Sequence, residues 1–223
     1  MDISVMRTTI LFDIDHTLFD SDKYRDICFR VLGEKLNQRD LELFMALAER
    51  EYKKIRSLGT FKPGEFATQI LTQLGISGDS DKLSEIFFDE QYIDEACYPD
   101  VSGVVESLSN KPLTTLGILS FGPDALQRKK IQSIIHMLHS DAIYINEVDK
   151  TEDIPTILRK HADEQVYIID DVLSVLQRFK SFDSSVITVL IERDTDKPGE
   201  ESKGLFNPDF KINKLSELLT VIK

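Results

Sequence analysis

The feature that most constrains the fold of this chain is a short apolar run, TTILFDI at residues 8–14, which contains Asp13 near its end and is followed by Asp15. The run is rich in β-branched residues and mostly apolar, which is typical of a strand covered on both faces, and such strands belong to parallel sheets. Parallel strands are joined by crossover connections that are usually helical. The run therefore predicts an α/β protein with a buried first strand that ends in acidic side chains.

The rest of the chain shows two different patterns of apolar residues. From residue 21 to 96 apolar side chains recur at helical spacing, and no convincing strand interrupts them. From residue 97 onward helices and strands alternate, with strands predicted at 114–119, 142–145, 166–169 and 186–191 and helices at 101–108, 124–138, 154–161 and 215–222. We therefore predict a Rossmann-like three-layer core made of residues 1–20 and 97–223, interrupted by an all-helical cap domain at 21–96.

Charge and composition argue against several classes of protein. The formal net charge of -12 disfavours a protein that binds nucleic acid by neutralising phosphates. No stretch approaches the roughly 20 apolar residues of a membrane span, and the N-terminal run is too short for the core of a signal peptide. The two cysteines, Cys28 and Cys97, lack metal-ligand spacing and predict free thiols. We expect a cytoplasmic protein with neither nucleic-acid nor membrane partners.

Polar residues at the predicted strand ends, with one lysine between the third and fourth strands, form the candidate site: Asp13, Asp15, Ser120, Lys150, Asp170 and Asp171. Ligands of parallel sheets bind at the carboxyl ends of the strands, so these residues should meet at one edge. Clustered carboxylates make an oxygen-rich site for Mg²⁺. With Mg²⁺ and the lysine present, the site attracts a phosphoryl group, which a carboxylate can then attack. A second carboxylate two residues further on can serve as acid and then as base.

The order of these groups resembles the four motifs of the haloacid dehalogenase (HAD) superfamily. The first motif is DIDHT at residues 13–17, and Ser120, Lys150 and the adjacent pair Asp170 and Asp171 follow in the family's order. The predicted helical insertion resembles the superfamily's helical cap. The resemblance implies a Mg²⁺-dependent phosphatase that acts on a small-molecule phosphomonoester through an aspartyl-phosphate. Dehalogenase members lack a carboxylate two residues after the nucleophile, so Asp15 favours the phosphatase over the dehalogenase.

The resemblance also implies a role for each residue of the first and third motifs. Asp13 would be the nucleophile and would bind Mg²⁺ with its other oxygen. Asp15 would be the general acid/base and would lend its backbone carbonyl to the metal. Lys150 would neutralise the phosphoryl group and fix the nucleophile. His16 stands where the family often has Gly or Asn, and its role is left open.

The second and fourth motifs would bind the phosphoryl group and the metal. Ser120 would hydrogen-bond the phosphoryl group, and Phe121 beside it is also assigned to phosphate binding, although its side chain cannot donate a hydrogen bond. Asp170 would be a direct metal ligand, and Asp171 a direct or water-mediated one. The predicted cap also contains a run of basic residues, Lys53, Lys54, Arg56 and Lys62. We favour a solvated helix face, paired with Glu49 and Glu51, over contact of this run with an anionic substrate.

Two alternatives share the predicted fold. A phosphomutase would need a cap residue that directs the phosphoryl group to a second hydroxyl, and the sequence identifies none. A non-catalytic regulatory or interaction protein would keep the fold and the metal site. Members of the superfamily that have lost activity usually lack the equivalent of Asp13 or Asp15, and both residues are present here. The sequence leaves open which phosphate ester is bound and whether the protein is a monomer or a homodimer.

Overall fold

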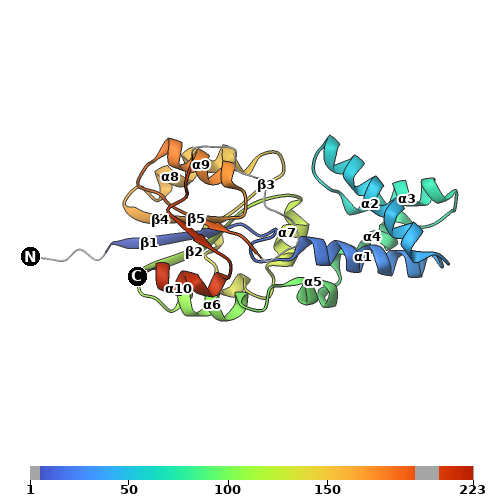
Figure 1. Ribbon diagram of the computed structural model, residues 1–223, viewed down its shortest axis with the longest axis horizontal. Coiled ribbons are helices and arrows are strands. Elements are labelled where there is room, and N and C mark those ends of the chain that lie inside the picture. The colour runs from blue at the N-terminus through green and yellow to red at the C-terminus, as the bar shows by residue number, and fades with distance from the viewer. Residues whose placement is uncertain (1–5, 194–205, 223) are drawn as a thin grey trace, which may run out of the picture.

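One parallel sheet organises the core of the computed structural model, which describes residues 6–193 and 206–222 (Figure 1). Its six strands have the order β3-β2-β1-β4-β5-β6, and each pair of neighbours is parallel. The strands are β1 (Arg7–Phe12), β2 (Thr114–Phe121), β3 (Ile143–Asn146), β4 (Glu164–Asp170), β5 (Ile187–Ile191) and β6 (Phe210–Ile212). The predicted Rossmann-like α/β class is confirmed.

Strand β1 lies inside the sheet, which explains its uninterrupted apolar sequence. Ile10 and Phe12 belong to the hydrophobic cluster on one face, and Leu11 belongs to the cluster on the other, because successive side chains of a strand alternate. All three side chains are fully buried. Helices cover both faces and complete the three layers (Figure 1): α6 (Val101–Ser109) and α10 (Leu218–Val221) lie on one face, and α8 (Ile154–Lys160) and α9 (Leu173–Phe182) on the other.

The strand order creates a topological switch point between β1 and β4. From β1 the chain moves outward to β2 and β3, crosses back to β4, and then moves outward in the opposite direction. Phe12 pairs with Ile118 on one side and Ile169 on the other, and the N–H of Asp13 donates to the carbonyl of Ile169 at 2.9 Å. Ligands of open parallel sheets bind outside the carboxyl ends of the strands at such a point.

Residues 21–96, between the first strand and the rest of the core, consist of helices joined by short turns. This segment contains α1 (Ser21–Lys35), α2 (Leu41–Leu58), α3 (Pro63–Leu74), α4 (Ser80–Ser84), α5 (Glu90–Ala96) and a 3₁₀ turn at Glu85–Phe88. Its interior is aromatic: the Phe29 and Phe66 rings stack with centroids 5.0 Å apart, and Phe61 and Phe87 pack beside them. Figure 1 shows this segment extending from the carboxyl end of the sheet. Within the described residues, no helix combines the length and apolar character that crossing a bilayer requires.

Several predicted elements differ from the observed ones. The predicted helix at 124–138 is wrong beyond Lys130, where α7 (Asp124–Lys130) ends and a 3₁₀ turn, Ile135–Met137, follows later. Ile131 and Ile134 are buried there, so packing of β-branched side chains, which are weak helix formers, favours turns over continued helix. The sequence analysis missed α9 and β6, and the predicted closing helix is a 3₁₀ turn, Leu215–Glu217, followed by the short α10.

Candidate active site

The acidic motif after β1 is carried by a tight turn. The carbonyl of Ile14 accepts hydrogen bonds from the N–H groups of Thr17, Leu18 and Phe19 at 3.2, 2.9 and 3.0 Å. His16 has a φ of 59°, in the left-handed region that costs a residue with a Cβ about 1 kcal/mol. That conformation explains why the HAD pattern often has Gly or Asn at this position, since both adopt it more readily.

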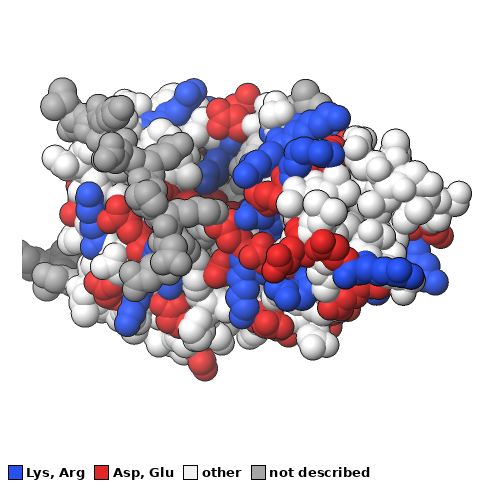
Figure 2. Space-filling model, turned by 45° about the vertical axis from the view of Figure 1, so that its right-hand side comes forward, with Lys and Arg blue, Asp and Glu red and all other residues white. Residues whose placement is uncertain are grey.

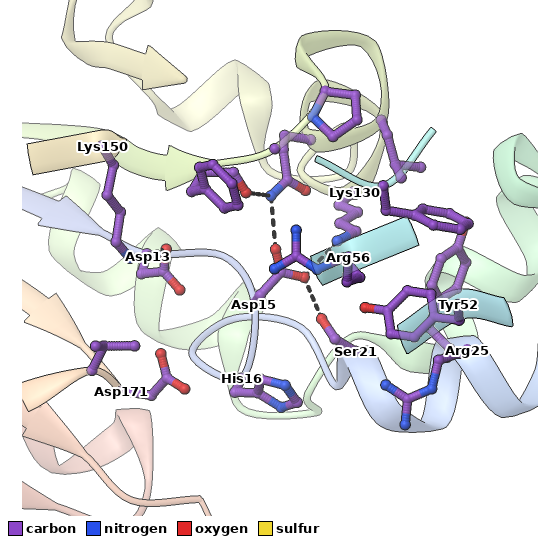
Figure 3. A pocket seen from close by; sticks show the side chains of 18 of the residues that line it. Asp13, Asp15, His16, Ser21, Arg25, Tyr52, Arg56, Lys130, Lys150 and Asp171 are labelled. Atoms are coloured by element: carbon purple, nitrogen blue, oxygen red, sulfur yellow. Dashed lines mark hydrogen bonds and ion pairs between the residues drawn. The ribbon is translucent and has the colours of Figure 1, made fainter. Parts of the chain in front are cut away.

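Three carboxylates from the ends of β1 and β4 meet at the switch point. One oxygen each of Asp13, Asp170 and Asp171 lie within 4.8 Å of one another, and the first two residues are buried. Lys150 begins the 3₁₀ turn after β3 and is also buried. Its Nζ lies 2.7 Å from Asp13 Oδ1 and 2.7 Å from Asp170 Oδ2. The structure thus brings four of the predicted site residues together, and Figure 3 shows three of them, Asp13, Lys150 and Asp171.

Negative charge exceeds positive charge in this cluster. Burial raises the pKa of Asp13 well above its usual range; Lys150 opposes the rise, and the carboxylates of Asp170 and Asp171 add to it. Burial and then Asp170 raise the pKa of Asp171 to about 7. Burial disfavours the ammonium of Lys150, but its two carboxylate partners outweigh burial and raise its pKa. A single cation among three carboxylates leaves the cluster short of positive charge, and an all-oxygen donor set fits a hard divalent cation.

Asp15 is held by a different set of partners, on α1 and α7. Its Oδ1 lies 2.5 Å from Lys130 Nζ and accepts a hydrogen bond from the Ser21 hydroxyl, and its Oδ2 accepts one from Gln127 Nε2 at 2.7 Å (Figure 3). Burial raises the pKa of Asp15, but Lys130, Ser21 and Gln127 outweigh it and hold the pKa below its usual range. In this conformation Asp15 is an ionised hydrogen-bond acceptor.

The second motif is divided between the interior and the cavity. Ser120 is fully buried in β2, and its hydroxyl accepts a hydrogen bond from Gln127 Nε2 at 3.0 Å. Ser120 is not among the residues that line the cavity, whereas Phe121 and Gly122 are. The carbonyl of Phe121 accepts from the same Gln127 nitrogen at 2.8 Å. Phosphate binding by Ser120 and Phe121 stays a prediction.

A cavity of about 430 Å³ lies between the sheet edge and the helical segment. The core contributes the acidic residues, Lys150 and hydrophobic side chains such as Val175, and the helical segment contributes Arg25, Arg56 and several aromatic rings. Figure 3 shows Asp13, Lys150 and Asp171 on one side of the view, Arg25 and Tyr52 on the other, and Arg56 between them beside Asp15. The cavity therefore has an acidic, lysine-bearing end and an aromatic, arginine-bearing wall.

The basic run of the helical segment is mostly a solvated helix face, as predicted. Lys53 pairs with Glu49 at 3.3 Å and Lys54 with Glu51 at 3.9 Å. Lys62 pairs instead with its neighbour Glu65, at 3.2 Å. Arg56 differs from the other three because it lines the cavity, with its guanidinium carbon 5.3 Å from the centroid of the Phe121 ring.

The sequence analysis missed the two α7 residues that hold Asp15. Gln127 and Lys130 are buried and stand three positions apart in DALQRKK, so they share one face of the helix. Buried polar groups need partners, but the burial of this helix face and its place beside Asp15 come from the fold, so the sequence carries no local signal that identifies the two residues.

No family model matches the chain, and no curated protein is similar to it in sequence. Solved structures do match in fold. A haloacid dehalogenase-like hydrolase from Burkholderia xenovorans LB400 has a TM-score of 0.76 at 16% identity, covering 97% of this chain and 97% of that chain. A HAD hydrolase from Bacillus subtilis bound to magnesium has a TM-score of 0.66 at 16% identity, covering 98% and 99%.

The structural neighbours include both phosphatases and dehalogenases. A phosphatase structure from Clostridium difficile has a TM-score of 0.63 at 16% identity, covering 96% of this chain and 98% of that chain. Dehalogenase structures match as well. At these identities the likeness shows the fold, which is the Rossmann-like fold of HAD hydrolases with helices inserted after the first strand.

Proposed function

We propose that this protein is a Mg²⁺-dependent hydrolase of a small-molecule phosphomonoester, with Asp13 as the nucleophile. One observation carries the proposal: the carboxylates of Asp13, Asp170 and Asp171 and the amine of Lys150 converge at the switch point of the sheet. Residues from the ends of two strands and from the loop after a third form this group, and a purely structural purpose would not require several like charges at one buried point.

The residues fit the metal that the proposal requires. Asp13, Asp170 and Asp171 would hold Mg²⁺, and Asp15 would add its backbone carbonyl. The pKa values of Asp13 and Asp171, raised by burial and by neighbouring carboxylates that Lys150 only partly offsets, are those of acids short of positive charge. When bound, the ion would neutralise charge on the phosphoryl oxygens. One of the neighbours in fold is bound to magnesium, which supports this choice of metal.

The reaction would divide between two groups of residues. An oxygen of Asp13 would bond to phosphorus while the bond from phosphorus to the leaving-group oxygen breaks, and Lys150 would fix Asp13 and offset charge on the phosphoryl group. Water would then attack the aspartyl-phosphate, giving phosphate and free Asp13. Asp15 would accept the proton of that water. To supply a proton to the leaving group in the first step, Asp15 would first have to loosen its contact with Lys130.

A carboxylate at position 15 also supports the phosphatase reading over the dehalogenase reading. An acid two residues beyond the nucleophile serves to move protons to and from an ester oxygen, whereas release of a halide needs no proton donor. We further propose that residues 21–96 act as a cap that covers the substrate and excludes water. We also propose that the enzyme is cytoplasmic and that its substrate is a soluble phosphate ester.

The experiment is a screen for phosphate release from sugar phosphates, nucleotides and aryl phosphates, with and without Mg²⁺. Asp13→Asn should abolish turnover while leaving the fold intact by circular dichroism. Asp141→Asn provides the matched control, since Asp141 is an exposed surface acid paired with Lys160 and should leave activity unchanged. Folded protein that binds Mg²⁺ yet releases no phosphate from any ester would contradict the proposal.

A further inference from the structure

The cations that line the cavity differ in how fully their charge is neutralised. Lys150 contacts two carboxylates, Asp13 and Asp170, and Lys130 contacts Asp15. Arg25 pairs with Asp22 and Glu49, at 2.9 Å each. Arg56 is the exception: no carboxylate in the described parts of the chain forms an ion pair with it.

The contact of Arg56 with the core leaves its hydrogen-bonding edge free. Its guanidinium lies over the ring of Phe121, 5.3 Å from the centroid, within the range of a cation–π contact. A cation–π contact does not use the five N–H donors of the guanidinium, and no hydrogen bond from them to another described residue is present. These donors match the two oxygens of a carboxylate or of a phosphoryl group.

The position of Arg56 places these donors beyond the carboxylate cluster, on the side of the helical segment. Arg56 comes from α2, and in Figure 3 it lies beside Asp15, between the group of Asp13, Lys150 and Asp171 and the residues Arg25 and Tyr52. Thr60, just beyond α2, donates a hydrogen bond to the carbonyl of Glu147, so this part of the segment also contacts the core. In the space-filling view, both blue and red side chains lie along the rim of the hollow between the two parts of the molecule (Figure 2).

The wall beside Arg56 is aromatic. Tyr52 and Phe61 line the same cavity, with ring centroids 5.2 Å apart, and Phe29 and Phe87 also line it. The volume of about 430 Å³ is at the small end of the range for ligand pockets. A phosphoryl group at the acidic end would thus leave space along this wall for a compact apolar body.

From this arrangement we infer that the substrate is a phosphate ester whose leaving group has a compact apolar body and ends in a second oxyanion, which Arg56 binds. The inference rests on the proposed function for the phosphoryl end of the site. Because Arg56 has no carboxylate partner among the described residues, its charge would also offset part of the acidic field of a chain with net charge -12. That field otherwise repels a doubly anionic substrate. The oxyanion can be a carboxylate or a second phosphoryl group, since both match the guanidinium.

Matched aryl phosphates test the inference. The pair is 4-carboxyphenyl phosphate and 4-carbamoylphenyl phosphate, which differ in the charge of the distal group and little in shape. For the wild type with Mg²⁺, we expect kcat/KM to favour the carboxylate by about tenfold or more, the size of a charge-assisted hydrogen bond. Arg56→Met should bring that ratio close to one, and Arg56→Lys should restore part of it. Replacing the carboxylate with a phosphonate shows which oxyanion is preferred.

The control removes a charge from the same helix without touching the cavity. Lys53→Met takes away an exposed cation, paired with Glu49, three positions before Arg56, and it should leave both the ratio and the activity unchanged. If Lys53→Met lowers the ratio as much as Arg56→Met does, long-range charge accounts for the preference and the inference is overturned. An equal ratio in the wild type and in Arg56→Met overturns it as well.

A binding measurement separates failure of this inference from failure of the proposed function. Calorimetry compares 4-carboxybenzylphosphonate with its carbamoyl analogue, because neither compound can be hydrolysed. Should the carboxylate bind about tenfold more tightly in the wild type and not in Arg56→Met, the oxyanion site stands even if no ester is turned over. Turnover of aryl phosphates with no dependence of rate or affinity on Arg56 would leave the phosphatase standing and reject the oxyanion site.

Discussion

Strand β4 carries a buried or half-buried acid at each end, and the two acids lie in opposite electrostatic settings. Glu164, at its amino end, has its Oε2 2.8 Å from His161 Nδ1 and accepts a hydrogen bond from the Thr9 hydroxyl. Burial raises the pKa of Glu164, but these partners outweigh burial and lower it. Asp170, at the carboxyl end, about 20 Å away, shares one lysine with Asp13.

The difference separates an acid whose partners the fold supplies from one that we propose to be functional. The group around Glu164 supplies its own donors, and Tyr144 completes it by contacting His161 Nε2 at 3.3 Å. The group around Asp170 does not supply enough donors for its carboxylates. Burial, and then repulsion from Asp170, raise the pKa of the neighbouring Asp171 to about 7. A buried charge that the fold leaves unbalanced is costly unless a ligand balances it. Variants at the two ends should therefore affect different properties.

The largest difference should come from the nucleophile. Asp13→Asn removes the oxygen that would attack phosphorus, so phosphate release should fall by about 10³-fold or more. The same variant removes one of several repelling carboxylates, so thermal stability without metal at pH 8 should not fall. Glu164→Gln is the comparison, with the opposite outcome expected: retained activity and lowered stability. Equal loss of activity in both variants would break the distinction between the two ends.

Removing the metal should affect only the carboxyl end. Saturating Mg²⁺ at about 100 times its dissociation constant would stabilise the folded state by about 2.7 kcal/mol, a rise in melting temperature of about 5–10 °C for a chain of this size. Chelation should reverse the rise and stop turnover. Asp171→Asn should reduce the rise because it removes a ligand. Differential scanning fluorimetry across a Mg²⁺ series measures this, and a comparable reduction in Glu164→Gln would contradict the prediction.

The sequence predicted the sheet edge better than it predicted the elements that surround it. The end of β1 is encoded locally, because a β-branched apolar run stops at Asp13. The order of the later motifs then places Lys150 and Asp170 at the same edge, and the structure brings these residues together. Strand β6 escaped prediction because its three residues, with Lys211 exposed at the centre, are too few for their alternation of apolar and polar side chains to be recognised.

Partners that depend on tertiary packing could not be read from the sequence. Lys130 lies 115 positions from Asp15, and nothing local shows that α7 carries it there. Arg56 belongs to the same basic run as Lys53 and Lys54, and only the packing of α2 over Phe121 separates it from them. Helical periodicity gives the face on which a residue lies, whereas the neighbour of that face is set by the whole fold.

A moderate effect on turnover should follow when Asp15 loses its partner. Asp15 lies in the candidate site, as Asp170 does, but its carboxylate is held by donors of the fold, as that of Glu164 is. Lys130→Met would leave the Asp15 carboxylate without the contact that positions it, and because the lost positioning should outweigh easier protonation, we expect kcat to fall about tenfold with little change in KM. Lys130→Arg should recover part of kcat. Arg128→Met is the control, because Arg128 is exposed and pairs with Asp124; a loss there, or a change confined to KM, would count against the role.

The smallest effect should come from Glu164→Gln, and it should depend on pH. A carboxyl group whose pKa is lowered by folding stabilises the folded state above its unfolded pKa, and that contribution is lost as the pH falls through the folded pKa. The variant should therefore be about 1 kcal/mol less stable than the wild type at pH 7, and the difference should shrink below about pH 4. Urea unfolding at both pH values measures it. A difference that grows on acidification would mean that Glu164, like Asp171, is an acid that the fold leaves without a counter-charge.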